Sequence, residues 1–346
     1  MKDWHIYLDG MRAPVRLVNC DDLHKRLQAY LPNWAYRSVP RDDTHAWATV
    51  VCAAGKFRLT TDFHNAPVYH KTEVNAVCDL IAKLSYQTAK ENSDQLSLHM
   101  AAVEIGGRLV LFPAVRRAGK SLLSVALSRI GGQVFTDDAL PLRVVAGEPI
   151  QGEATGVAPR IRLPLPENLG QDLRNYISGQ GGPRNRQYTY VACQHLPKHG
   201  TRAPVGAVVL LEYSDSGQPK FEAANRGETL DRLIHHDFYR ARDTRSVLSA
   251  LHHLVMQGSC YRFTYSDPDA AARAIVEFFE RQFADLPSPA PVRQGLQMLQ
   301  DHADEQPKLH EASVYRVSDH LQVVEAEGMY FAADCAGHRI IRLDVG

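Results

Sequence analysis

The segment from Leu98 to Arg143 constrains the fold more than any other part of the chain, because its elements follow the order of a phosphate-binding loop. Two apolar runs within residues 103–112 flank Gly106-Gly107, which predicts a β-hairpin. After a break in the apolar pattern, residues 122–130 carry apolar side chains close to helical spacing, which predicts an α-helix. A short apolar run over 133–136 then predicts a buried strand.

The loop between the predicted hairpin and the predicted helix reads A-x-x-x-x-G-K-S. Backbone N–H groups at the start of a helix, together with the positive end of the helix dipole, bind phosphate groups. We therefore expect Lys120 to reach the β- and γ-phosphates of a nucleotide and the Ser121 hydroxyl to ligate Mg²⁺. The residues expected to line the nucleotide site are Ala114, Val115, Arg116, Arg117, Ala118, Gly119, Lys120, Ser121 and Leu122.

The loop departs from the usual pattern at its first position, where Ala114 replaces a glycine. A Cβ atom at this position restricts positive φ angles and crowds the loop. Arg116 and Arg117 either place positive charge near the γ-phosphate, where it would stabilise the transition state, or point to solvent. The alternative to a functional loop is a segment that only caps the helix.

Two acidic residues, Asp137 and Asp138, follow the predicted strand over 133–136. Phosphoryl transfer to a hydroxyl requires a metal ligand and an acceptor for the hydroxyl proton. Because adjacent residues at a strand end point to opposite sides, one carboxylate is expected to bind Mg²⁺ and the other to act as the base. An ordinary turn after a strand, where aspartate is common, is the structural alternative.

These residues resemble the HPr kinase/phosphorylase family, in particular its divergent HPr-kinase-like branch. The resemblance rests on His99 before the hairpin, the GKS loop, the helix and the acidic pair. It implies an α/β fold with a P-loop kinase core of the HPr kinase type, which transfers the γ-phosphoryl group of ATP to a hydroxyl of a peptide or protein. It also implies that Asp138 is the base, that Asp137 lies on the metal side, and that His99 and Lys120 belong to the active site.

Glu153, in the sequence GEATGV, matches a family glutamate that precedes a Gly-Val step, and it is the third expected Mg²⁺ ligand beside Ser121 and Asp137. The chain lacks a clear counterpart of the basic segment with which the family grips the HPr protein, which argues against HPr as the acceptor. Members of the family often form oligomers, so the resemblance leaves a homo-oligomer open.

Two other functions stay open on the sequence. A small-molecule kinase would use the same scaffold and differ only in its acceptor pocket. A nucleotide-binding pseudokinase or sensor that recruits a peptide would account for Ala114 and the arginine-containing loop without catalysis.

The balance of charge argues against a nucleic-acid-binding protein, since Lys plus Arg and Asp plus Glu number 39 each in a chain of 346 residues. No apolar run approaches the roughly 18 residues of a transmembrane helix. The first ten residues contain two acids and lack the apolar core of a signal peptide. The six scattered cysteines form no C-x-x-C pair, so we expect a cytoplasmic protein without a membrane partner.

We expect three regions along the chain. Residues 1–92 are predicted to form a mixed α+β N-terminal region, residues 93–285 the HPr-kinase-like P-loop core, and residues 286–346 a linker and a small β-rich tail. His64 and His70 are expected on a loop of the first region. Within the core, the sequence GQGGPRN at 179–185 predicts either a flap over the acceptor site or an ordinary surface loop.

The tail is predicted to contain a polar helix over 293–303 and strands over 314–324, 329–333 and 340–343. This pattern is faintly similar to the β half of the PqqD-like peptide-recognition domain. The similarity implies a leader-peptide binder or a strand surface that pairs with a partner. The alternative is a β appendage that packs on the kinase core.

Overall fold

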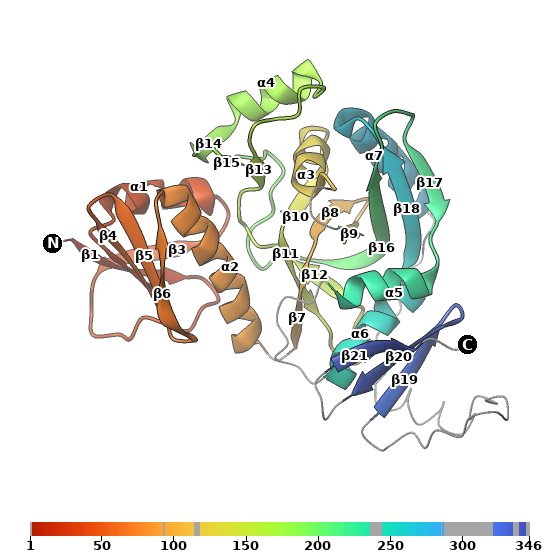
Figure 1. Cartoon of the computed structure of the whole chain (residues 1–346), viewed down its shortest axis with the longest axis horizontal. Helices are drawn as coiled ribbons and strands as arrows, with labels where there is room; N and C mark the ends of the chain where they lie inside the picture. Colours follow the sequence, from red (N-terminus) through yellow and green to blue (C-terminus); the bar gives the residue numbers. More distant parts are fainter. Residues whose placement is uncertain are drawn as a thin grey trace.

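The computed structural model describes residues 2–92, 94–113, 118–235, 244–284, 286, 321–334 and 339–343 (Figure 1). These residues form a mixed α/β structure with several separate sheets. Of the expected phosphate-binding loop, residues 114–117 lie outside this range, as do the expected helix over 293–303 and most of the expected linker.

A six-stranded sheet with the order β3-β1-β2-β4-β5-β6 is built from the N-terminal residues. Its strands are β1 (Asp3–Leu8), β2 (Val15–Val18), β3 (Tyr36–Pro40), β4 (Ala48–Ala53), β5 (Lys56–Thr61) and β6 (His64–His70). The expectation of a loop at His64 and His70 was wrong, because these residues begin and end β6, which pairs with β5. The alternation of apolar and polar residues is weak in β6, because it is an exposed edge strand. The sequence therefore does not indicate a strand here, and pairing with β5 decides its conformation.

Helices α1 (Asp21–Tyr30) and α2 (Glu73–Glu91) accompany this sheet. Helix α2 begins as its sequence predicts, because the hydroxyl of the N-cap Thr72 accepts a hydrogen bond from the Asn75 N–H at 3.2 Å. It packs against β5 and β6 on one side and against β7 and β11 of the next sheet on the other. Helix α2 therefore stands between the two sheets (Figure 1).

The central sheet has the order β10-β8-β9-β16-β12-β11-β7, with β17 and β18 continuing from β16. Its strands are β7 (Gln95–His99), β8 (Ala101–Ile105), β9 (Arg108–Phe112), β10 (Gln133–Thr136), β11 (Ala139–Arg143), β12 (Gln151–Glu153), β16 (Arg202–Tyr213), β17 (Lys220–Ala223) and β18 (Ser259–Tyr265). Strand β16 runs parallel to β9 and β18, and the other pairs are antiparallel. The predicted hairpin at Gly106-Gly107 is confirmed as β8 and β9.

Helices cover both faces of the central sheet. Strand alternation sends Val110 and Phe112 of β9 toward α3 (Lys120–Arg129) and α7 (Pro268–Ala284), and sends Leu109 and Leu111 toward α5 (Arg226–Ile234) and α6 (Thr244–Gln257). Both faces are thus apolar, which explains why β9 and β16 read as continuous apolar runs rather than as alternating ones.

A small sheet with the order β13-β15-β14 and helix α4 lie beside this core. The elements are β13 (Arg160–Arg162), α4 (Gln171–Gly179), β14 (Gly181–Arg184) and β15 (Tyr188–Val191). The expected loop at 179–185 is therefore wrong in its centre, where Gly181–Arg184 pair with β15. The glycines and the proline of this segment favour a loop, but a bulged strand at the edge of a sheet accommodates both residue types.

The C-terminal strands β19 (Leu321–Ala326), β20 (Met329–Asp334) and β21 (Arg339–Leu343) form a separate antiparallel sheet. They turn at Glu327-Gly328, which both have positive φ. Ala326 and Phe331 belong to the same apolar cluster as Leu230 of α5 and Leu251 of α6. The tail strands therefore pack on the helices of the core.

Main-chain hydrogen bonds join the N-terminal residues to the core. The Ala158 N–H donates to the Tyr30 carbonyl at 2.9 Å, and the Asn33 N–H donates to the Gly156 carbonyl at 3.1 Å. The His199 N–H donates to the Asn33 carbonyl at 2.8 Å. Across the part of the chain that the structure describes, no helix has the length and apolar character that crossing a membrane requires.

Candidate active site

The N-cap residue of α3 makes no side-chain hydrogen bond to the first main-chain N–H groups of the helix. Its N-cap is Gly119, which has a left-handed conformation with φ +78° and places the following amides at the head of the helix. The preceding Ala118 carbonyl accepts a hydrogen bond from the Tyr265 hydroxyl at 2.8 Å. The first N–H groups of a helix and the positive end of its dipole bind anions, so this end of α3 can bind a phosphate group.

Asp137 follows β10 and is buried, with 8% of its surface exposed. Burial, together with repulsion from Asp138, raises the pKa of its carboxyl to about 7. Hydrogen bonds from the Ser121 hydroxyl and the Arg160 N–H act in the opposite direction and lower this pKa. The Arg160 N–H lies 3.1 Å from Asp137 Oδ2. The structure thus brings Asp137 and Ser121, two of the expected Mg²⁺ ligands, into direct contact.

Asp138 lines the same pocket as Asp137 and is only partly buried. Its Oδ1 lies 3.2 Å from His99 Nδ1, and its Oδ2 lies 3.6 Å from the Arg160 guanidinium. The contact with His99 depends on strand pairing, because Ala139 of β11 stands opposite His99 of β7. A partly exposed carboxylate held between an imidazole and a guanidinium suits an acceptor for a proton.

Lys120 begins α3 and faces the acidic pair. Burial lowers the pKa of its ammonium group, and the carboxylates of Asp138 and Asp137 act in the opposite direction. An amine enclosed with two carboxylates at a helix N-terminus is a suitable partner for a phosphate group that enters between them.

Glu153 lies at the end of β12 and has other partners. Its Oε2 accepts hydrogen bonds from Arg202 Nε at 3.0 Å and Gln95 Nε2 at 3.5 Å. Its role as a third metal ligand therefore stays a prediction. In the described part of the chain, no three His, Cys, Asp or Glu side chains are grouped so that they could hold a metal ion.

The structure describes only some of the other residues that were expected to contact the nucleotide. Ala114, Val115, Arg116 and Arg117 lie outside the described residues. Ala118 is buried and Leu122 is half-buried at the start of α3.

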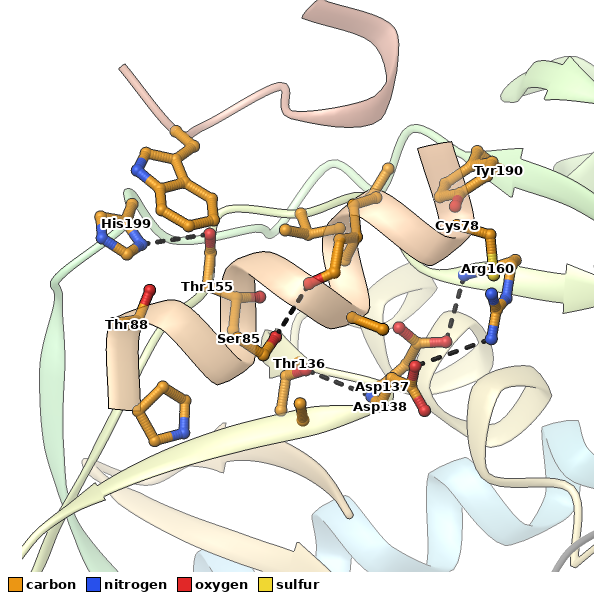
Figure 2. Close-up of a pocket in the computed structure, with 17 residues that line it drawn as sticks. Cys78, Ser85, Thr88, Thr136, Asp137, Asp138, Thr155, Arg160, Tyr190 and His199 are labelled. Carbon is orange, nitrogen blue, oxygen red and sulfur yellow. Dashed lines mark hydrogen bonds and ion pairs between the residues drawn. The ribbon is translucent and has the colours of Figure 1, made fainter. Parts of the chain in front are cut away.

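A pocket opens on the acidic pair from the side of α2 (Figure 2). Asp137, Asp138, Thr136, Ala139 and Pro141 form one wall, and Cys78, Ile81, Ala82, Ser85 and Thr88 of α2 form the other. The remaining lining residues are Trp34, Thr155, Val157, Ala158, Arg160, Tyr190 and His199.

Sequence reasoning missed the contribution of the N-terminal region to this pocket. The pattern of α2 predicts its buried stripe but does not indicate which element covers the stripe. Trp34 stacks on the His199 ring, with centroids 4.0 Å apart, although the two residues are far apart in sequence. Arg160 of β13 contacts both aspartates of the pair.

No protein-family model matches the chain. No curated protein matches it either. Among solved structures, the chain is similar to the Hpr(Ser) kinase/phosphatase from Coxiella burnetii, with 13% sequence identity and a TM-score of 0.29 over 55% of this chain and 99% of that chain. A likeness with a TM-score of 0.29 carries no argument about activity.

Proposed function

We propose that the protein is a kinase that transfers the γ-phosphoryl group of ATP to a hydroxyl group, with Mg²⁺ as cofactor. One observation carries the proposal. The contact between Ser121 and the buried Asp137 lies at the N-terminus of α3, next to Lys120, while Asp138 stands beside it with His99. Phosphoryl transfer to a hydroxyl requires these functions in one place.

The start of α3 fits the phosphates of a nucleotide. Its N-cap residue, Gly119, makes no side-chain hydrogen bond to the first N–H groups and lets the main chain turn into the helix without a Cβ atom. A Cβ atom at Gly119 would clash with the Tyr265 hydroxyl. Lys120 adds a positive charge at the same helix end, as in other phosphate-binding loops.

The oxygen atoms of Ser121 and Asp137 fit Mg²⁺, which prefers oxygen ligands and takes few of them from the protein. Asp137 is buried and close to a second carboxylate, which raises its pKa and makes its ionised form costly. A cation would remove that cost. When bound, Mg²⁺ would neutralise charge on the phosphates and ATP would supply the phosphoryl group.

Asp138 is assigned as the base. It would accept the proton of the acceptor hydroxyl, while His99 and Arg160 keep the carboxylate oriented toward the pocket. Glu153 as a metal ligand, Arg116 and Arg117 at the γ-phosphate, and a cytoplasmic location stay predictions within this proposal.

Calorimetry with Mg-ATP tests the proposal. Lys120→Ala should weaken binding by on the order of tenfold to a hundredfold, the usual effect of removing a charge-assisted contact. The exposed Lys198→Ala is the control and should bind like the wild type. No binding to folded wild-type protein would refute the proposal. Binding without phosphoryl transfer to any acceptor would instead support a nucleotide sensor.

A further inference from the structure

We infer that the pocket beside Asp138 binds the phosphoryl acceptor, and that the acceptor is a small, uncharged alcohol rather than a serine on a folded protein. The inference rests on the proposed function, because it takes Asp138 as the base. It adds the class of the substrate. It also proposes that residues of α2, a helix outside the predicted kinase core, select the acceptor by lining the pocket.

The pocket borders the proposed catalytic residues at the acidic pair. Asp137 and Asp138 line it, whereas Lys120 and Ser121 do not. The acidic pair therefore lies where the pocket adjoins the helix end that suits the donor. An alcohol in the pocket would place its hydroxyl at Asp138, and in-line transfer requires this oxygen to attack the γ-phosphorus opposite the leaving β-phosphate oxygen.

One face of α2 closes the pocket. Cys78, Ile81, Ala82, Ser85 and Thr88 follow one another at intervals of three or four residues, so they share that face. Main-chain hydrogen bonds at Tyr30 and Asn33 tie the same N-terminal region to the core. The wall is thus fixed in place, and a large acceptor cannot open the pocket without breaking these bonds.

The burial of the lining limits the size of the acceptor. Each residue that lines the pocket is buried or half-buried, and none is exposed. His199 lies at one end of the pocket and Tyr190 at the other (Figure 2), and Trp34 stacks on the His199 ring. A serine on a folded protein surface carries neighbouring main chain that such a crevice does not admit, whereas a free alcohol of a few heavy atoms does.

The charges of the lining disfavour an anionic acceptor. Arg160 is the basic residue of the lining, and it already faces Asp138 and stacks over the Tyr188 ring at 4.8 Å. An anionic group would therefore lie beside two carboxylates, with the Arg160 guanidinium already paired to one of them.

Two lining hydroxyls suit a hydroxylated ligand. The Ser85 hydroxyl donates a hydrogen bond to the Ile81 carbonyl at 3.2 Å, and the Thr155 hydroxyl donates one to the Phe135 carbonyl at 3.2 Å. Each oxygen keeps lone pairs that can accept a hydrogen bond from a ligand hydroxyl or amide. Ile81, Ala82 and Pro141 supply apolar contact for its carbon atoms.

The test is phosphoryl transfer from Mg-ATP to a series of acceptors, measured as ADP formation and confirmed by mass spectrometry of the product. The series contains glycerol, N-acetylserinamide, N-acetylserine and an uncharged serine-containing nonapeptide. N-acetylserinamide and N-acetylserine match in size and differ in charge. We expect transfer to glycerol and N-acetylserinamide, and at least about tenfold less to N-acetylserine and to the nonapeptide.

Two variants narrow the pocket, Ala82→Phe and the milder Ser85→Leu. Both should reduce transfer at least about tenfold while Mg-ATP binding stays at the wild-type level, which also shows that the protein is folded. Lys90→Phe, on an exposed position of the same helix outside the lining, is the matched control and should transfer normally.

Three outcomes would overturn the inference. The first is transfer to the nonapeptide that is as fast as transfer to the small uncharged acceptors, or faster, and that keeps the same rate in Ala82→Phe and Ser85→Leu. The second is intact Mg-ATP binding without transfer to any member of the series. The third is the absence of Mg-ATP binding, which would refute the proposed function as well and so differs from the first two.

Discussion

The hydroxyl of Tyr265 donates a hydrogen bond to the main-chain carbonyl of Ala118 at 2.8 Å, which ties the end of β18 to the residue before the Gly119 turn. Gly119 follows with φ +78°, and the Tyr265 oxygen occupies the space where a Cβ atom would be. Two elements distant in sequence therefore position the first amides of α3, where the phosphates are proposed to bind.

Gly119→Ala should weaken Mg-ATP binding strongly and destabilise the protein by on the order of 1–3 kcal/mol, because the new Cβ atom is strained and displaces Tyr265. Gly107→Ala is the matched control. Gly107 also has positive φ, at +81°, but its Cβ atom would meet no neighbour. The control should lose stability and keep Mg-ATP binding, as measured by urea unfolding and calorimetry. Normal binding by Gly119→Ala would contradict the assigned role of this turn.

Asp138→Asn should lower kcat by roughly 10²- to 10⁴-fold, the usual contribution of a general base. Mg-ATP affinity should stay near that of the wild type, because Asp138 is assigned to the acceptor. His99→Gln should reduce kcat less, since His99 only holds Asp138 in place. Steady-state kinetics with the exposed Asp172→Asn as control would decide. Full activity of Asp138→Asn would rule out this base.

The stability of the metal-free protein should fall as the pH rises from about 4 to 7. Burial and the neighbouring Asp138 raise the pKa of Asp137 from 3.8 to about 7. In this window the folded state keeps a proton that the unfolded state has lost, so deprotonation favours unfolding. Asp137→Asn should remove this part of the pH dependence. Urea unfolding at pH 5 and pH 8 measures it, and identical pH profiles for both proteins would contradict the prediction.

The titration of His199 should change the stability of the protein with pH in the opposite direction. Burial lowers its pKa below the ordinary value of 6.5. As the pH falls below that value, the unfolded state takes up a proton that the folded state resists, so stability is lost on acidification. His199→Gln should weaken this loss. Tryptophan fluorescence, to which Trp34 on the His199 ring contributes, can follow the unfolding. A wild-type acid response in the variant would show that other groups cause it.

The local elements of the site could be predicted from the sequence. The glycine pair at 106–107 indicates the hairpin, the spacing over 122–130 indicates α3, and the run over 133–136 indicates β10. The tail strands follow the predicted pattern wherever the structure describes them. Short-range rules suffice for these elements because turn geometry and side-chain periodicity are properties of a few adjacent residues.

Local rules failed where a neighbour decides the conformation. Strand β6 and the centre of 179–185 were expected as loops, and each is held in extended form by pairing with an adjacent strand. The pairing partner of a strand is a long-range property that neither glycine content nor periodicity encodes.

The chain by itself determined which residues are the candidates for the chemistry, because GKS and Asp-Asp are recognisable by their order and spacing. Only the tertiary structure decided their surroundings. The pairing of β7 with β11 sets His99 beside Asp138, and the packing of α2 against the same strands makes an N-terminal helix the wall of the pocket. Periodicity shows that a face is buried, but the partner that buries it is chosen by the packing of the whole chain.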